Sequence, residues 1–347
     1  MKLWVHADPF RVGTREFFCY TFTMSEGLPK TVPRTLEQQL ADLRELQRSL
    51  VEAREAGDVA AAKLLIENNL DLVSTHETLD LSLADAERIL GKESVFGPKT
   101  VEKIFGNKPE TIPDIPFFKE ELERAKELGQ QLIFYTDEMA GKAGSSGPLT
   151  LENLRTIFTK SHDDKKVFYS QGSDDFWYKD EDFFKKEKPR TGWRLTSKDL
   201  IPNSTSKNYV DQTNVLIDHL QNQVFKGMKL PKQYEDAIAQ WKKKRAEIEP
   251  LAKSSDDAKW KRGSQMLADL AITKLTRELP VEVMYRLIVN DQANKDKPLP
   301  STYTWTASRD SDGYLVYVGY FDSDGAYVSR NEPRNSDDHL GVSFSRS

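Results

Sequence analysis

The sequence contains a single cysteine, Cys19, in 347 residues. An intramolecular disulfide is therefore excluded, and the fold must be held by packing and hydrogen bonds. The sequence also lacks any run of about 18 apolar residues, and its first residues, MKLWVHADPF, contain no hydrophobic signal core. We therefore expect no signal peptide and no membrane insertion. The cellular location stays unknown, because cytoplasm, virion and non-classical surface display all fit.

A strong excess of one charge is absent as well. The formal net charge is -5, and basic runs such as Lys242–Arg245 alternate with acidic ones. A mildly acidic protein has no general attraction for nucleic acid or for anionic membranes, and short basic runs are typical of solvated helix faces. We expect no nucleic-acid partner.

The residue patterns of common catalytic and metal sites are missing too. The five histidines show no pairing at i,i+3 or i,i+4, and the sequence has no P-loop, no G-x-S-x-G and no G-x-G-x-x-G. We predict no catalytic residue, no metal and no cofactor.

Two alternative functions stay open. One is a hydrolase-type enzyme around His162, Asp163 and Asp164, and the other is a cell-wall-associated structural protein, because FGPKT at 96–100 is similar to a peptidoglycan-binding repeat.

The first third of the chain is predicted to be mostly helical. The segment TREFFCYTFTM (14–24) predicts an initial strand, and leucines recur at spacings of three and four between Leu36 and Leu50. A short helix is expected from Ser82 to Leu90, with Ser82 and Asp85 as a capping box. Prolines at 109, 113 and 116 disfavour both helix and strand. They predict a domain boundary, with residues 1–116 as a separate N-terminal region.

Residues 117–347 are predicted to form an α+β domain. A helical insertion is expected at about 209–277, followed by short strands in YTWTAS, GYLVYVGYF, GAYVS and LGVSFSR, which Asp-Gly turns separate. This spacing predicts C-terminal antiparallel strands. Alternation predicts that Val316, Val318, Val342 and Phe344 point inward and that Ser343 points outward.

The last segment, residues 302–347, differs in composition from the rest. No lysine follows Lys297, whereas Tyr, Ser, Asp, Asn and Arg are frequent. Tyrosine gives a large amphipathic contact area at a small entropic cost, and Ser and Asn give adaptable hydrogen bonds, as in antibody loops. A plain sheet is the alternative, because tyrosine is common in strands. The predicted contact residues are Arg309, Asp310, Tyr314, Tyr317, Tyr320, Tyr327, Ser329, Arg330, Asn331, Arg334, Asn335 and His339.

Several segments together resemble one family. TGWRLTSKDL (191–200) and ELPVEVMYRLI (278–288) each resemble the WRLPTEAEWEYA segment of the formylglycine-generating-enzyme branch of the C-type lectin fold. The segment TYTWTASRDSDGYLVYVGYFDSDGAYVSRN, followed by LGVSFSR, resembles the end of that branch, with its WTSS strand, hairpin and final G-x-R strand. The chain departs from the pattern at Thr196, where proline is usual, and at Val342–Phe344, where arginine is common.

The same end pattern resembles the target proteins of diversity-generating retroelements, including the variable proteins of nanoarchaea. In that family, adenine-specific mutagenesis turns asparagine codons into codons for Tyr, Asp, Ser, His, Gly and Arg, the residues enriched after position 302. The resemblance implies a C-type-lectin-like domain that binds an unknown protein or surface ligand through a variable surface. The enzymatic relatives need cysteines in the C-terminal domain, whereas the only thiol here is Cys19, so formylglycine generation is not expected.

Overall fold

The structure is a computed structural model. It describes residues 81–347 except 108, 110, 141–145, 159–166 and 170–175, and before them the strands β1 (Ala7–Val12) and β2 (Arg15–Tyr20) and single residues between Glu45 and Leu64. Strands β1 and β2 pair antiparallel. The strand predicted from TREFFCYTFTM is thus present as β2.

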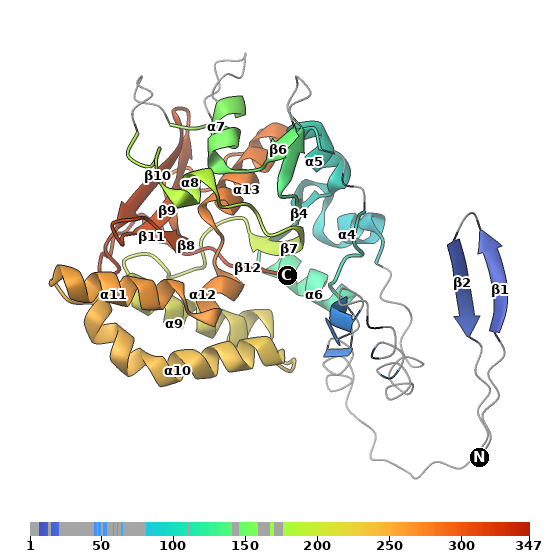
Figure 1. Cartoon of the computed structure of the whole chain (residues 1–347), viewed down its shortest axis with the longest axis horizontal. Helices are drawn as coiled ribbons and strands as arrows, with labels where there is room; N and C mark the ends of the chain where they lie inside the picture. Colours follow the sequence, from blue (N-terminus) through green and yellow to red (C-terminus); the bar gives the residue numbers. More distant parts are fainter. Residues whose placement is uncertain are drawn as a thin grey trace, which may run out of the picture.

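Helices and several sheets make up the described part, which is consistent with the predicted α+β class (Figure 1). Helices α9 to α12 fill the predicted insertion. The helices are α4 (Leu83–Leu90), α5 (Pro98–Phe105), α6 (Lys119–Glu127), α7 (Leu151–Phe158), α8 (Asp182–Lys185), α9 (Tyr209–His219), α10 (Lys232–Ala252), α11 (Asp257–Ala268), α12 (Ala271–Thr276) and α13 (Pro280–Asn294), with a 3-10 turn η1 (Lys92–Ser94) and a π turn η2 (Leu220–Val224).

Two four-stranded sheets form the centre of the molecule. The first has the order β12-β7-β4-β3, and the second, which we call the C-terminal sheet, has the order β10-β9-β8-β11. Strands β5 (Glu138–Ala140) and β6 (Ser146–Pro148) form a separate pair. The sheet strands are β3 (Val95–Phe96), β4 (Gln130–Tyr135), β7 (Gly192–Ser197), β8 (Tyr303–Arg309), β9 (Leu315–Asp322), β10 (Gly325–Asn331), β11 (Leu340–Gly341) and β12 (Ser345–Arg346).

Capping side chains fix the starts of two helices. Ser82 accepts the N–H of Asp85, whose carboxylate accepts the N–H of Ser82, so the predicted capping box of α4 is confirmed. At α13 the carboxylate of Glu282 accepts the N–H of Leu279 (2.9 Å), and Pro280 occupies the first helical position. These caps satisfy backbone donors that the helix itself leaves without partners.

The C-terminal sheet lies between two hydrophobic clusters. Its buried Val316, Val318 and Val328 pack with α13 in one cluster, whereas Trp305 and Leu315 belong to the other, with the helices of the insertion. Figure 1 shows α9, α10 and α11 together beside this sheet. The sheet is therefore covered on both faces over part of its length.

The predicted boundary at residue 116 does not separate two cores. Strand β3 pairs in parallel with β4 across it, and Ile115 and Phe117 are buried in the same cluster as α4 and α5. Most of the proline-rich segment is exposed, but it is tied to the fold, since the indole N–H of Trp193 donates to the carbonyl of Pro113 (2.8 Å). Residues 81–116 therefore share a core with the rest of the described chain.

The prediction for Ser343 was wrong. Val342 and Phe344 are buried as expected, but Ser343 is also only 1% exposed. Its hydroxyl donates to the carboxylate of Glu278 (2.8 Å) and pairs with that of Thr304 (3.0 Å). Alternation failed because both sides of this segment are covered, one by apolar and the other by polar groups.

Candidate functional site

The strand register puts one row of side chains on the outer face of the C-terminal sheet. Trp305 of β8 is opposite Tyr317 of β9, which is opposite Ser329 of β10. Tyr303 and Tyr327 are likewise both opposite Gly319. Because directly paired residues share a face, these side chains lie on the face away from Val316 and Val318.

The outer face is buried near Trp305 and becomes partly accessible farther along the strands. Trp305 is buried against Tyr209 of α9, at a ring distance of 5.6 Å. Farther along, four tyrosines are only partly buried, together with Tyr169 from the segment after α7. We call this set the tyrosine face: Tyr169, Tyr303, Tyr317, Tyr320 and Tyr327.

The rings of the tyrosine face form one continuous row. Tyr169 stacks on Tyr327 at 3.8 Å between centroids, and Tyr327 meets Tyr320 edge to face at 5.9 Å. Tyr303 then stacks on Tyr320 (5.3 Å) and meets the edge of Tyr317 (5.2 Å). Such pairs contribute about 0.5–1.5 kcal/mol each beyond their buried area. The rings thus hold each other in place while part of each stays accessible.

A β-bulge places Tyr320 in this row. The register shifts between Gly325 and Tyr327 of β10, and Tyr320 has a φ of 52°, in the left-handed region. Gly319 has a φ of 153°, and a Cβ there would approach the carbonyl oxygen of Thr302 to 2.3 Å. Bulges redirect side chains. Here the bulge turns Tyr320 to the outer face and Phe321 into the core.

Burial raises the pKa values of two phenols of the tyrosine face, those of Tyr303 and Tyr327. Burial is the main cause that raises the pKa of Tyr303 to about 12, followed by Tyr317, Tyr320, Asp322 and Asp337. The pKa of Tyr327 is also raised, by desolvation first and then by its hydrogen bond with Tyr169. These two phenols therefore stay neutral at physiological pH and offer hydroxyl groups for hydrogen bonding.

A second aromatic cluster lies at the β8–β9 turn. The Arg330 guanidinium lies 4.6 Å from the ring centroid of Trp177 and 5.0 Å from that of Tyr314. It forms ion pairs with Asp310 and, at 3.0 Å, with Asp312. Asp310 also accepts the N–H of Tyr314 (2.8 Å). This cluster fixes the turn through contacts within the chain.

The structure thus divides the predicted contact residues. Tyr317, Tyr320 and Tyr327 come together on the tyrosine face, Ser329 shares that face, and the exposed His339 lies 6.4 Å from the Tyr320 ring. Asp310 is only 3% exposed and cannot offer its carboxylate to a ligand, since Arg330 and the turn backbone use it. Arg309, Tyr314, Arg330, Asn331 and Asn335 are partly buried, and Arg334 is exposed and paired with Glu332.

Sequence reasoning missed three aromatic residues of these clusters. Tyr303 carried a signal, because it lies two positions before Trp305 in a strand and therefore shares its face. Tyr169 and Trp177 carried none, since a long-range contact brings them to the sheet: Phe168 bridges Ala326, and the indole of Trp177 donates to the carbonyl of Val328 (3.1 Å).

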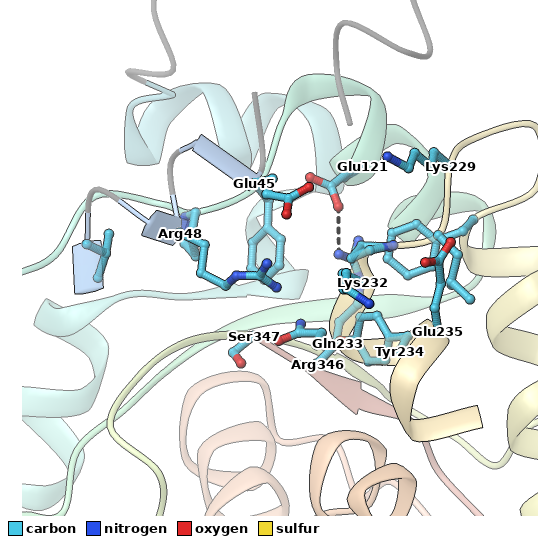
Figure 2. A pocket seen from close by; sticks show the side chains of 16 residues that line it. Glu45, Arg48, Glu121, Lys229, Lys232, Gln233, Tyr234, Glu235, Arg346 and Ser347 are labelled. Atoms are coloured by element: carbon cyan, nitrogen blue, oxygen red, sulfur yellow. Dashed lines mark hydrogen bonds and ion pairs between the residues drawn. The ribbon is translucent and has the colours of Figure 1, made fainter. Parts of the chain in front are cut away.

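A cavity of about 370 Å³ lies elsewhere, and none of the predicted contact residues lines it (Figure 2). Arg346 lines it with its guanidinium 4.9 Å from the Phe117 ring and 5.3 Å from that of Phe225, ion-paired with Glu121 at 2.7 Å. The lining carries both acidic and basic groups, among them Glu45, Arg48, Lys229, Lys232 and Glu235. This mixture does not favour a ligand of one charge.

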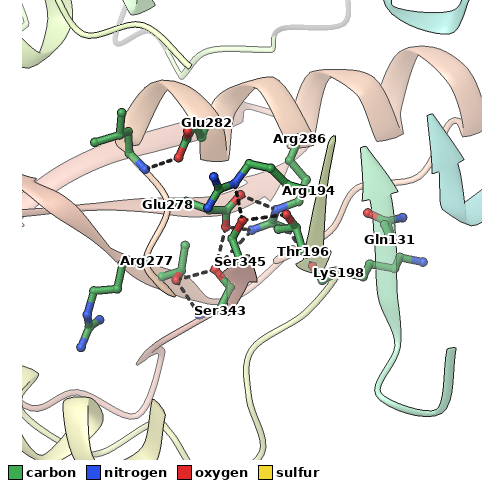
Figure 3. A network of polar contacts seen from close by, with 12 residues as sticks. Gln131, Arg194, Thr196, Lys198, Arg277, Glu278, Glu282, Arg286, Ser343 and Ser345 are labelled. Atoms are coloured by element: carbon green, nitrogen blue, oxygen red, sulfur yellow. Dashed lines mark hydrogen bonds and ion pairs between the residues drawn. The ribbon is translucent and has the colours of Figure 1, made fainter. Parts of the chain in front are cut away.

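A network of buried charged groups lies along one side of α13 (Figure 3). Arg286 donates two hydrogen bonds to Glu278, at 3.0 and 2.9 Å, and a third to the carbonyl of Lys198 (2.8 Å). Burial alone would raise the pKa of Glu282, but its pairing with Arg190 outweighs burial and lowers that pKa. Glu278, Glu282 and Arg286 are at most 1% exposed, and of these paired side chains only Arg190, at 32%, reaches solvent, so this network supports the fold.

The structure describes only some of the other residues that the sequence singled out as possible sites. His162, Asp163 and Asp164 of the alternative enzyme hypothesis lie outside the described residues. Within the described part of the chain, no group of three His, Cys, Asp or Glu side chains could hold a metal ion. The same part contains no helix that is both long and apolar enough to cross a membrane.

Comparison with known proteins gives no match: no family model, no curated protein and no solved structure is similar to this chain.

Proposed function

We propose that the protein is a non-enzymatic binding protein, and that residues 302–347 form a retroelement-diversified ligand surface on a C-type-lectin-like domain. The ligand is a protein or another cell-surface molecule. The observation that carries this proposal is the tyrosine face, a row of five partly accessible rings on a sheet whose other face is closely packed. Clustered aromatic anchors with a polar surround suit a macromolecular ligand.

The alternation of buried and accessible residues along the strands supports the proposal. Val316, Val318 and Phe321 have no exposed area, whereas the tyrosines interleaved with them are partly accessible. Substitution at the accessible positions leaves these three buried side chains in place, and at Tyr303 and Tyr317 it also changes contacts with the cluster that contains Trp305. A diversified protein needs this separation, because each variant must still fold.

The conformation of Tyr320 supports an asparagine origin for its codon. Its φ of 52° is in the left-handed region, where Asn and Asp are enriched and where an aromatic residue is unusual. An asparagine codon becomes a tyrosine codon when its first adenine is replaced by thymine. The backbone at this position thus suits the residue from which diversification would start.

The arrangement of the segments that resemble the family supports a C-type-lectin-like domain. GWRLTS forms β7, which pairs antiparallel with β12 near the end of the chain. ELPVEVMY begins α13, and Glu282 of that segment binds both Leu279 and Arg190, close before β7. The segments on which the resemblance rests therefore meet in one part of the fold.

The neighbouring DNA tests the proposal. We expect a reverse-transcriptase gene and a near-copy of the DNA that encodes residues 302–347, with differences only at adenines of that copy. A near-copy that differed equally at all four bases, or the absence of any copy, would contradict diversification. In that case the proposal would be reduced to a fixed binding surface.

A further inference from the structure

The tyrosine face is bordered by carboxylates. Asp322 and Asp337 are close enough to contribute to the raised pKa of Tyr303, after burial and two tyrosines, and Asp322 and Asp324 contribute likewise at Tyr327. Asp337 and Asp324 are exposed, and Asp322 is partly exposed. The border of the face is thus negatively charged.

Among the described residues, no lysine or arginine forms an ion pair with the carboxylates of Asp322, Asp324 or Asp337. Lys297 lies beside the β9–β10 hairpin, where its ammonium contacts the backbone carbonyl of Asp322 and lies 4.6 Å from the Phe321 ring. The Nε2 of His339 lies 3.5 Å from the carboxylate of Asp338, which is not one of these three aspartates. Asp322, Asp324 and Asp337 therefore have no ion-pair partner among the described residues, and Lys295 and Lys297 line a hollow together with Asp322.

The same sheet shows how its surface holds a cation. At the β8–β9 turn, the Arg330 guanidinium lies between Trp177 and Tyr314 and pairs with two aspartates, Asp310 and Asp312. Aromatic faces attract cations through their quadrupole, and carboxylates add charge-assisted hydrogen bonds. The tyrosine face offers the same two kinds of group, rings and aspartates, with no cation of the described chain between them.

We propose that the partner bound at the tyrosine face presents a segment rich in arginine or lysine, whose cations lie against the rings and pair with the bordering aspartates. This inference rests on the proposed binding function and specifies its partner class. The rings extend in a row over three strands instead of surrounding one point, so an extended segment with several cations fits better than a single small cation.

Charge complementarity also fits the sequence of this region. After Lys297 the chain has no lysine, and Arg330 and Arg334 are both engaged with acidic residues of the chain. The C-terminal segment itself therefore contributes aspartates and no lysine to this part of the face. Complementary charge speeds association and selects partners, and its effect falls as salt rises.

Peptide binding to the full chain tests the inference. The probe is a short fluorescent peptide in which arginine alternates with glycine, and the reference peptide has glutamate in place of arginine; binding is measured by fluorescence anisotropy. We expect saturable binding of the arginine peptide alone, weakened by salt. Replacing Tyr303 or Tyr327 by Ala should weaken binding by about two- to tenfold, the range for loss of one cation–π contact.

Charge variants separate recognition from folding. In Asp322→Asn and Asp337→Asn, the amide oxygen can still accept the N–H of Asp324 (2.8 Å) or His339 (2.8 Å), so the turns keep their hydrogen bonds. The double variant should bind the arginine peptide several-fold more weakly. The matched control is Asp218→Asn with Asp236→Asn, which removes the same charge from exposed sites on α9 and α10 and should leave binding unchanged.

Three results would overturn the inference: no saturable binding of the arginine peptide, equal binding of the glutamate peptide, or an equal loss of binding in the control variant. These results would leave the proposed display function standing if the adenine-marked repeat is found beside the gene. Conversely, arginine-peptide binding without such a repeat would support a fixed cation-binding face and contradict diversification.

Discussion

The network along α13 and the tyrosine face differ in how far their polar side chains are exposed and in what those side chains contact. Along α13, Glu278 and Arg286 have no more than 1% of their area exposed, and each charge has a partner fixed by geometry. On the tyrosine face the rings contact one another and keep part of their surface accessible, and Tyr303 and Tyr317 also pack against the cluster that contains Trp305. We expect the first region to depend on the identity of its residues and the second to tolerate exchange. This contrast is what a scaffold with a replaceable surface requires.

The largest expected effect comes from breaking the buried network. Glu278→Gln leaves the Arg286 guanidinium buried without a carboxylate, and loss of one partner of a buried pair typically costs about 3–5 kcal/mol. We expect a loss of this size in the free energy of unfolding, measured by urea denaturation. As a control, Glu332→Gln at the Glu332–Arg334 pair, whose arginine is 42% exposed, should cost less than about 1 kcal/mol. Equal losses would contradict the contrast between the two regions.

The second largest loss of stability is expected from a substitution at the bulge that places Tyr320 on the tyrosine face. Gly319→Ala adds a Cβ 2.3 Å from the carbonyl oxygen of Thr302 at a φ of 153°. We expect a loss of about 3 kcal/mol, the upper end for a strained backbone position. Gly129→Ala is the matched control, because Gly129 has a φ of 63° with nothing within 4 Å of an added Cβ, and it should cost only about 1–2 kcal/mol. Thermal unfolding of both variants compares the two costs.

The third effect is a pH dependence at Glu187, which accepts a hydrogen bond from Ser308 of β8 (2.7 Å). Burial raises the pKa of this carboxyl from 4.5 to about 7. Between pH 4.5 and about 7 the folded protein keeps the Glu187 carboxyl protonated, whereas the unfolded chain releases that proton. The contribution of Glu187 to the free energy of unfolding is therefore lost as pH rises through about 7. The loss amounts to about 1–3 kcal/mol.

The measurement is the difference in unfolding free energy between the protein and Glu187→Gln from pH 4.5 to pH 8. Burial lowers the pKa of His219 from 6.5 to about 4, so His219 acts in the opposite direction, with stability lost as pH falls through that range. Because both proteins contain His219, its contribution cancels in the difference. A difference that stays constant with pH would show that the Glu187 pKa is not raised.

The smallest effect is expected on the tyrosine face itself. Tyr320→Asn places a residue that tolerates the left-handed region at a φ of 52°, so the relief of backbone strain offsets the lost ring contacts. We expect a change in unfolding free energy within about 1 kcal/mol, whereas Tyr320→Val, with a β-branched side chain, should cost more. A larger loss for Asn than for Val would show that the ring is part of the core.

Much of the scaffold could be predicted from the sequence, because local signals determine it. Ser82 and Asp85 gave the start of α4, and alternation put Val316 and Val318 in the core. The same alternation would put Tyr320 with the valines and Phe321 outside, and only the bulge reverses this. A bulge depends on the pairing of strands and has no clear local signal apart from Gly319.

The parts that could not be predicted depend on long-range contacts. Tyr169 joins the face because its segment docks beside β10, and Ser343 is buried because Glu278 of a distant segment needs a hydrogen-bond donor. The prolines before residue 117 predicted a boundary, but a proline-rich segment is extended both in a linker and within a core. The pairing of β3 with β4 decides between these two cases.

The most direct test of the central claim is the DNA sequence of this gene in many individual cells of one lineage. We predict that differences concentrate at codons of the tyrosine face, such as those of Tyr317, Tyr320 and Tyr327, while the interleaved codons of Val316, Val318 and Phe321 stay constant. Differences spread evenly over both sets, or the same tyrosines in every cell, would contradict the account of a constant scaffold that carries a diversified surface.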